Sequence, residues 1–290
     1  MVVQVKALAC ELPWRSGVPL SRFSSSEIAR EAIQRGIAAD ISGSTVWRWL
    51  HEDAIRPWQY RSWIFPQDPD FERKAGVVLD LYHGLWGSQR LGKGTYVICA
   101  DEKPGIQARI RLHDTQPPQP GHCTRVEHHY QRGGTLAYLA AWDVHRAKLF
   151  GRCESKGGIE SFDRLVAQVM GQEPYCSARR VYWIVDNGSA HRGERCVQRL
   201  RKAHRRIVAV HLPVHASWLN QIEIYFSIVQ RKALTPNDFE SLQDVPPRLL
   251  DFERRYEHIA EPFEWQFTRQ DLAQLLEKLG RDHAPLRRAA

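Results

Sequence analysis

Three acidic residues stand where they could bind a metal ion. Asp101 follows the apolar run 96–100 and Asp186 follows the apolar run 181–185, so each is expected at the end of a buried strand. Glu223 lies in a largely apolar segment with helical periodicity. Carboxylate oxygens are the ligands that Mg²⁺ and Mn²⁺ prefer, and such sites carry out phosphoryl transfer on nucleic acids. The three residues therefore predict metal-dependent chemistry on a phosphodiester.

The segment around Glu223 is expected to be a helix with a narrow polar stripe. Such a stripe on so apolar a helix indicates that this side of the helix lines a water-filled cavity. The alternative is that the stripe lies on the ordinary protein surface. The stripe consists of Asn220, Glu223, Ser227 and Gln230, and the opposite, apolar side consists of Trp218, Ile222, Tyr225, Phe226 and Val229.

Composition narrows the class of protein. The chain has 290 residues, 43% of them hydrophobic, which allows one large domain or two ordinary ones. No apolar stretch approaches the ~20 residues of a membrane helix. The N-terminal residues lack a charged region followed by an apolar one, so the sequence does not predict secretion. Six scattered cysteines indicate reduced thiols in the cytoplasm. The spacing of His122, Cys123, His128 and His129 matches no common zinc site.

Positive charge is concentrated in one segment. The net charge is +8, and residues 192–206 contain seven Lys or Arg residues and one Glu. Arg199 and Lys202 are candidates for contacts with DNA phosphates on this predicted helix, and a solvated helix face is the alternative.

The first 65 residues are expected to be helical. Residues 24–27 have the pattern of a capping box, and Gly36 ends the helix that this box begins. A second helix is expected from near Ser44, so the two helices form a helix-turn-helix candidate in which Ser44, Thr45 and Arg48 face DNA. A small helical subdomain that binds no DNA is the alternative.

The remaining pattern predicts an α/β core. Strands that first form a meander and later alternate with helices imply a mixed sheet with helices packed on its faces. The expected elements are a linker at 56–69, a helix at 71–83, a strand at 96–100, a hairpin of 135–142 with 147–151, a helix at 159–170, a strand at 181–185, the basic helix, a strand at 207–212 and a helical tail at 242–279 with a cap at Thr268.

Several motifs carry a resemblance to a known family. They are residues 100–103 (ADEK) with 106–107 (IQ), 185–191 (VDNGSAH), 215–223 (HASWLNQIE) and 262–265 (PFEW). With these motifs the chain resembles DDE transposases of the mariner-like superfamily, specifically the bacterial insertion-sequence 630 branch. The similarity extends over nearly the whole chain.

The resemblance implies a fold, an activity and a cofactor. It implies an RNase H-like core in which Asp101, Asp186 and Glu223 bind two Mg²⁺ or Mn²⁺ ions. The implied activity is cleavage of double-stranded DNA at the terminal inverted repeats of a transposon, followed by strand transfer into target DNA. A homodimer on DNA in the cytoplasm of a bacterium, associated with the nucleoid, is the expected assembly.

Some assignments keep an alternative. Neighbouring residues of a strand face opposite sides of the sheet, so only one of Asp101 and Glu102 can be the ligand. The family pattern favours Asp101, and Glu102 is the reserve. Asn187, His191 and Asn220 are candidates to support the ligands, with roles in turns, caps or the surface as the alternative.

The expected domains are a DNA-binding region, a linker with a helix, a catalytic core and a helical C-terminal segment, at 1–65, 66–95, 96–240 and 241–290. Relatives of this type carry more sequence before the helix-turn-helix, so an N-terminal truncation is predicted. Two other functions remain open. One is a non-catalytic DNA-binding regulator derived from a truncated transposase, and the other is an RNase H-like nuclease that hydrolyses without joining.

Overall fold

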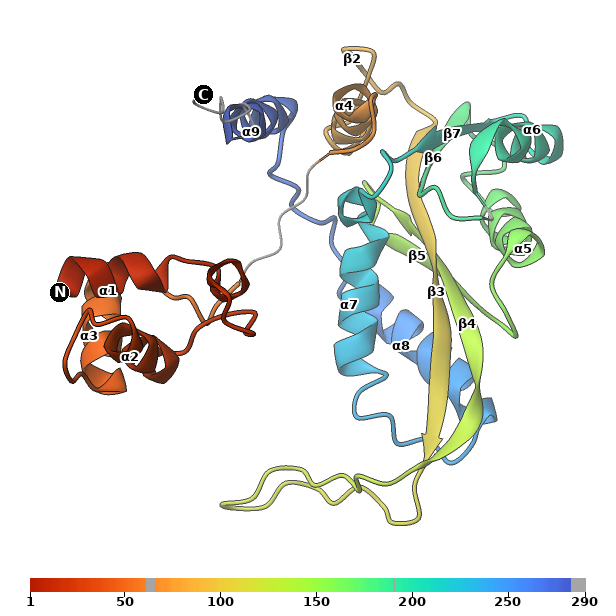
Figure 1. Cartoon of the computed structure of the whole chain (residues 1–290). Coiled ribbons are helices and arrows are strands. Elements are labelled where there is room, and N and C mark those ends of the chain that lie inside the picture. The colour runs from red at the N-terminus through yellow and green to blue at the C-terminus, as the bar shows by residue number, and fades with distance from the viewer. Residues whose placement is uncertain (61–65, 190, 283–290) are drawn as a thin grey trace. The chain divides into compact units, whose positions relative to one another are not determined.

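A five-stranded mixed sheet lies at the centre of the larger part of the chain (Figure 1). The computed structural model describes residues 1–60, 66–189 and 191–282, and the chain divides into two units, residues 1–64 and 65–290. The sequence-based boundary at residue 65 and the central part of the predicted linker lie outside the described residues.

The sheet of the larger unit combines antiparallel and parallel pairing. Its strand order is β5-β4-β3-β6-β7, in which β3, β4 and β5 form an antiparallel meander, whereas β6 and β7 run parallel to β3. The expectation of a mixed α/β sheet is confirmed. The strands are β3 (Thr95–Ile110), β4 (Gln131–Asp143), β5 (Lys148–Glu154), β6 (Arg180–Val185) and β7 (Ile207–His211).

Helices cover both faces of the sheet because its central strands are apolar on both sides (Figure 1). Val97 and Cys99 of β3 belong to the core that also contains side chains of α4, α7, α8 and α9. Ile98 and Ala100 belong to the opposite core, under α5 and α6. The helices are α4 (Phe71–Tyr82), α5 (Ile159–Met170), α6 (Gly193–Ala203), α7 (Ile222–Lys232), α8 (Val245–Glu257) and α9 (Arg269–Asp282), with short 3-10 helices at Ser217–Leu219 and Leu242–Asp244.

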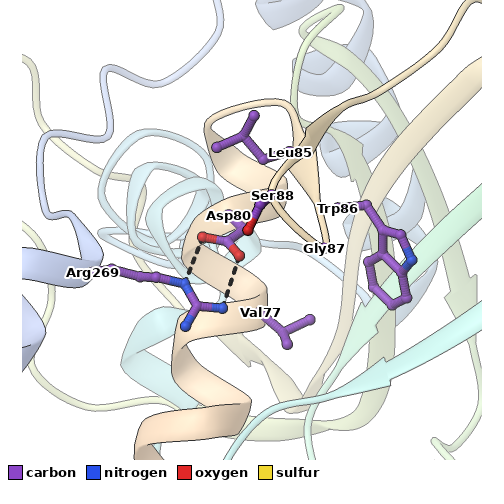
Figure 2. A pocket seen from close by; sticks show the side chains of 7 residues that line it. All are labelled: Val77, Asp80, Leu85, Trp86, Gly87, Ser88 and Arg269. Atoms are coloured by element: carbon purple, nitrogen blue, oxygen red, sulfur yellow. Dashed lines mark hydrogen bonds and ion pairs between the residues drawn. The ribbon is translucent and has the colours of Figure 1, made fainter.

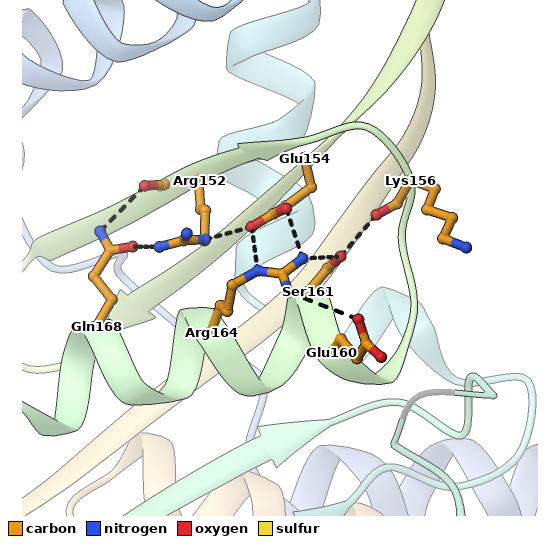
Figure 3. A network of polar contacts seen from close by, with 8 residues as sticks. Arg152, Glu154, Lys156, Glu160, Ser161, Arg164 and Gln168 are labelled. Carbon is orange, nitrogen blue, oxygen red and sulfur yellow. Dashed lines mark hydrogen bonds and ion pairs between the residues drawn. The ribbon is translucent and has the colours of Figure 1, made fainter.

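Strand β5 and helix α5 are joined by a polar network (Figure 3). The Arg164 guanidinium donates two hydrogen bonds to the Glu154 carboxylate, at 2.9 and 2.8 Å, and Arg152 donates to the same carboxylate. Hydrogen bonds from Arg164 and Arg152 lower the pKa of Glu154 to about 2. The effect of Arg164 is the largest, and it outweighs the opposing effect of burial. The network holds α5 against the edge of the sheet.

A second polar cluster lies under α7 and α8. The Tyr138 hydroxyl of β4 is 3.1 Å from the Tyr225 hydroxyl of α7 and donates to the Glu253 carboxylate of α8 at 3.1 Å. Glu253 also accepts a 3.0 Å hydrogen bond from the backbone amide of Gly151 in β5. A Cβ at Gly151 would overlap both the carboxylate and the Tyr138 hydroxyl, so the close approach requires glycine.

The last helix packs near the start of the larger unit. The Arg269 guanidinium at the beginning of α9 donates to both carboxylate oxygens of Asp80 in α4, at 2.7 and 2.8 Å. Figure 2 shows this ion pair in a cavity of about 570 Å³ that also contacts the small hairpin of β1 (Leu85–Trp86) and β2 (Gln89–Arg90). The Trp86 ring packs on Tyr182 with 4.5 Å between centroids, which anchors the hairpin to β6.

The smaller unit consists of three helices around an apolar core, α1 (Val2–Ala9), α2 (Ser25–Gln34) and α3 (Gly43–Glu52), with a 3-10 helix at Pro13–Ser16. The predicted capping box is confirmed, because Ser24 and Glu27 exchange side-chain to backbone hydrogen bonds. Helix α3 begins one residue before the predicted start at Ser44, because the Ser42 side chain caps it. Ile33 of α2 is 40% exposed.

Several elements differ from the sequence-based expectation. Strand β3 continues ten residues beyond the predicted end at residue 100, because its pairing with β4 resumes after a bulge between Lys103 and Ile106. Residues 111–130 form a long extension between these strands, with isolated bridges (Figure 1). Residues 258–268 are not helical, although the cap at Thr268 is confirmed. Among the described residues, no helix is both long enough and apolar enough to cross a membrane.

The Glu154 network predicts an acid-dependent loss of stability. The pKa of Glu154 lies below its ordinary value of 4.5, so the stabilisation is complete above that pH and is lost as the pH falls toward about 2. Glu154→Gln should remove about 1–2 kcal/mol of stability near neutral pH. Urea unfolding at about pH 6 and about pH 3 measures the free energy of unfolding of the wild type and of Glu154→Gln. The difference between the two should be smaller at the lower pH. An equal difference at both pH values would contradict the prediction.

The close packing at Gly151 predicts a large effect of one methyl group. Gly151→Ala should lower the free energy of unfolding by about 1–3 kcal/mol, because Tyr138 and Glu253 must move apart. The control is Gly92→Ala, whose Cβ would meet only the flexible end of Arg179 at 3.7 Å. Chemical denaturation should show little change in the control, and equal stabilities for the two variants would refute the packing argument.

Candidate active site

Asp101 lies on β3, in the middle of the sheet. Its side chain is 6% exposed and shares a face of the strand with Val97 and Cys99. One carboxylate oxygen accepts a 2.8 Å hydrogen bond from the backbone amide of Glu102. The carboxylate is thus held beside the face that α7 covers.

Glu102 points the other way. Its carboxylate accepts a 3.1 Å hydrogen bond from the backbone amide of Gly158, the residue that precedes α5. A negative charge is favourable there, because the helix N-terminus carries unpaired amides. A Cβ at Gly157 would overlap this carboxylate, so the turn approaches it closely. Strand alternation therefore separates the two neighbouring acids onto opposite faces.

Asp186 follows the last residue of β6 and is held by two hydrogen bonds to one oxygen. The backbone amide of Gly188 and Nδ1 of His191 each lie 2.8 Å from Oδ1. Because an ionised carboxylate only accepts, the histidine donates from Nδ1. The hydrogen bond from His191 is the largest cause that lowers the pKa of Asp186. Within the described residues, the second oxygen of Asp186 accepts no hydrogen bond.

The His191 ring is buried and fixed from several sides. It packs edge-on against Phe162 with 4.1 Å between centroids, and its backbone carbonyl lies 2.6 Å from Nε2 of His211. Nε2 of His191 is buried without a hydrogen-bond partner within the described part of the chain. Asp101, Asp186 and His191 each offer one ligand atom, and these atoms lie within 4.8 Å of one another.

The two aspartates form a cluster of negative charge. Burial first and then the charge of Asp186 raise the pKa of Asp101 to about 7. Among the side chains that the structure describes, in residues 1–60, 66–189 and 191–279, no Lys or Arg nitrogen lies within 4.0 Å of either carboxylate. Two converging carboxylates without a cationic side chain fit a divalent cation.

Asn220 lies in the turn before α7. Its Nδ2 donates to the carbonyl of Ala100 at 3.1 Å and approaches the Asp101 carboxylate at 3.4 Å. Its Oδ1, which can only accept hydrogen bonds, is buried without a partner in the described structure. The sequence-based placement of Asn220 on the helix was wrong, because α7 begins only at Ile222 and Asn220 has extended backbone angles.

Tyr82 of α4 holds this turn, and sequence reasoning missed it. Its buried hydroxyl donates to the carbonyl of Leu219 and accepts a 3.3 Å hydrogen bond from the backbone amide of Gln221. The residues before and after Asn220 are therefore tied to one side chain. A tyrosine in an apolar helix gives no sequence signal for such a role.

Glu223 is not part of the converging group. It lies in the first turn of α7, and its side chain is exposed. The pKa of Glu223 is raised, because the part of the carboxylate that is buried loses contact with water. The charge of the nearby Lys103 opposes this rise. Its charge nevertheless acts on Asp101 and is influenced by Asp186, so the three carboxylates share one electrostatic environment. Ser227 and Gln230 continue the predicted stripe as exposed residues, whereas Trp218, predicted on the apolar side, is 39% exposed.

The other candidates have separate surroundings. Asn187 donates from Nδ2 to the carbonyl of Leu212 at 2.7 Å and so ties the Asp186 loop to the segment after β7. Arg199 of α6 donates from Nε to Asp163 of α5 at 3.0 Å, and Lys202 is exposed in the last turn of α6. In the smaller unit, α3 exposes Ser44 and Arg48 and partly exposes Thr45.

The fold matches that of known transposase structures. The chain is similar to the Mos1 mariner paired-end complex with Mn (13% identity, TM-score 0.56, covering 97% of this chain and 76% of that chain). It is also similar to the Mos1 paired-end complex with Mg (14% identity, TM-score 0.54, 97% and 77%) and to the Mos1 strand transfer complex (13% identity, TM-score 0.50, 97% and 76%). The RNase H-like fold expected from the sequence is confirmed.

Family membership follows from the sequence itself. Residues 96–245 match the model of the DDE superfamily endonuclease domain, which is more than half of the chain. The protein belongs to the DDE superfamily of endonucleases. No curated protein matches the sequence.

The repulsion between Asp101 and Asp186 predicts that one substitution changes stability in different ways with and without metal. Asp101→Asn removes a buried charge beside Asp186, so without metal at about pH 8 it should raise the free energy of unfolding by about 1–3 kcal/mol. Mg²⁺ or Mn²⁺ should stabilise the wild type and should stabilise the variant much less. Thermal unfolding with a chelator or with added metal measures both effects. Glu102→Gln is the control, and a metal response that vanishes there but persists in Asp101→Asn would contradict the assignment.

Proposed function

We propose that the protein is a DDE transposase that cuts DNA at the ends of a mobile element and joins them to target DNA in a metal-dependent reaction. We assign it to the insertion-sequence 630 branch on the motifs at 185–191 and 215–223. The observation that carries the proposal is the convergence of Asp101 and Asp186, without a Lys or Arg partner among the described residues, in a DDE-family fold.

Asp101, Asp186 and Glu223 are the proposed ligands of two Mg²⁺ or Mn²⁺ ions. When bound, two such ions supply Lewis-acid stabilisation of the attacking and leaving oxygens in an in-line displacement at phosphorus. Glu223 is proposed as the third ligand because α7 places it in the electrostatic range of both aspartates. Glu102 is the weaker candidate, since its carboxylate is engaged by the Gly158 amide.

Three residues are proposed to position these ligands. His191 fixes one oxygen of Asp186 and leaves the other free, and Asn220 ties Asp101 to the turn before α7. Asn187 holds the Asp186 loop against the segment after β7. Because small displacements of reacting groups reduce rates strongly, such fixed carboxylates suit phosphoryl transfer.

The smaller unit is proposed to read the ends of the element. In a helix-turn-helix, the second helix enters the major groove, and here α3 presents Ser44, Thr45 and Arg48 away from the buried Val46 and Leu50. The partners would be the terminal inverted repeats and the target DNA, and cleavage of two ends favours a homodimer. The similar structures include Mos1 paired-end and strand transfer complexes, which is consistent with this assembly. We propose residues 1–65 for this role and 96–240 for catalysis, joined by 66–95 and followed by the helical segment 241–290.

A cleavage assay tests the proposal. The wild type is incubated with duplex DNA that carries the terminal repeats of the element and with Mg²⁺ or Mn²⁺. We expect nicks at the repeat boundary and joined products when target DNA is added. Asp186→Ala and Glu223→Ala should reduce both by at least about 1,000-fold, because each removes a ligand of the proposed metal site.

The products distinguish the alternative functions. Glu102→Gln is the matched control on the same strand and should retain most of the activity. Nicks without joined products would indicate a nuclease that only hydrolyses. If wild type and both ligand variants bind the DNA alike and none cuts it with either metal, the catalytic proposal fails and the regulator is favoured.

A further inference from the structure

The starts of the three parallel strands lie side by side at one end of the sheet. Thr95 of β3 pairs with Arg180 of β6, and the backbone amides of Arg179 and Arg180 donate to the carbonyl of Gly94 at 2.8 and 3.4 Å. On the other side of β6, the amide of Val181 donates to the carbonyl of Arg206 at 2.9 Å. Residues that precede β3, β6 and β7 are therefore neighbours in space, although they are far apart in the sequence.

This end of the sheet carries a concentration of positive side chains. All of these Lys and Arg side chains are exposed. In the described part of the chain, none of their nitrogens lies within 4.0 Å of a carboxylate oxygen. The nearby carboxylate of Glu173 accepts hydrogen bonds from Ser177 and Cys176, and the charge of Arg206 contributes to lowering its pKa. We call the cluster the strand-start surface; it consists of Lys93, Arg179, Arg180, Arg205 and Arg206, with Arg201 and Lys202 from the last turn of α6.

The strand-start surface and the two aspartates lie at opposite ends of β6. Arg180 is its first residue, and Asp186 directly follows its last residue. At roughly 3.3 Å per residue, six residues of strand separate them by about 20 Å. This length corresponds to about six successive phosphates along one DNA strand.

We propose that the strand-start surface binds the phosphate backbone of duplex DNA at a distance from the phosphodiester that is cut. This inference rests on the proposed function, because it takes duplex DNA as the substrate. Exposed Arg and Lys side chains without acidic partners gain the most from phosphates, since binding releases counterions without breaking ion pairs. Several such side chains on adjacent strand starts suit a repeating anion and carry no base specificity.

Affinity measurements on duplex DNA without metal test the inference separately from cleavage. The variant replaces Arg179, Arg180, Arg205 and Arg206 with Gln. The control replaces Arg73, Arg164, Arg248 and Arg254 with Gln; these exposed arginines each pair with a carboxylate and lie elsewhere on the larger unit. Both variants lose four positive charges, so they differ in the location of the loss and not in its size. Thermal unfolding verifies that both remain folded.

The expected result is a flatter salt dependence in the strand-start variant alone. With a duplex of about 60 base pairs, its plot of log affinity against log salt should lose about two to four units of slope, and affinity near 0.1 M salt should fall at least about tenfold.

Two outcomes overturn the inference. Equal salt slopes for the strand-start variant and the control on the long duplex would show that only net charge matters. A loss of binding to single-stranded RNA without a loss on duplex DNA would assign the surface to another partner. If the wild type binds DNA but never cuts it, the proposed function fails, while the slopes still decide the inference.

Discussion

The alternation of side chains along β3 is the constraint on which the candidate site depends. Asp101 and Glu102 are adjacent in sequence but face different helices, α7 and α5. Because β3 pairs with β4 on one side and with β6 on the other, its register is fixed from both edges. A slip of one residue would exchange the two acids between the faces and would move the apolar residues before them into the opposite cores, where their packing would no longer fit. The apolar packing of the sheet therefore decides which carboxylate meets Asp186.

The site is maintained against an electrostatic cost. Two carboxylates that converge in a half-buried pocket repel each other, and burial raises the pKa of Asp101 further. Surrounding contacts oppose relaxation of this arrangement: His191 holds Asp186, Asn220 reaches Asp101, and Tyr82 anchors the turn that contains Asn220. An arrangement that is unfavourable alone and rigidly held is typical of a site that binds a cation.

Those parts of the fold and of the candidate site that have a local cause could be predicted from the sequence. The apolar run before Asp186 correctly predicted the end of β6, and 3.6-residue periodicity predicted α5 with its observed bounds. The extent of β3 could not be predicted, because Pro104 and Gly105 in the bulge resemble the end of a strand. The position of Asn220 was missed because apolar residues continue the helical period through a turn. The Tyr82 contact joins residues 137 positions apart, and no local pattern reports such a pairing.

The net charge of +8 conceals a separation of charge along the parallel strands. The acidic pocket follows the end of β6, and the strand-start surface lies at its beginning, about 20 Å away by strand length. Between exposed charges, physiological salt screens interactions beyond about 8 Å, so the distant cations contribute little to neutralising Asp101 and Asp186. The net positive charge of the chain therefore does not neutralise Asp101 and Asp186. Neutralisation of the pocket has to come from charges that bind within it, whereas the strand-start cations remain available to a polyanion that extends across the sheet.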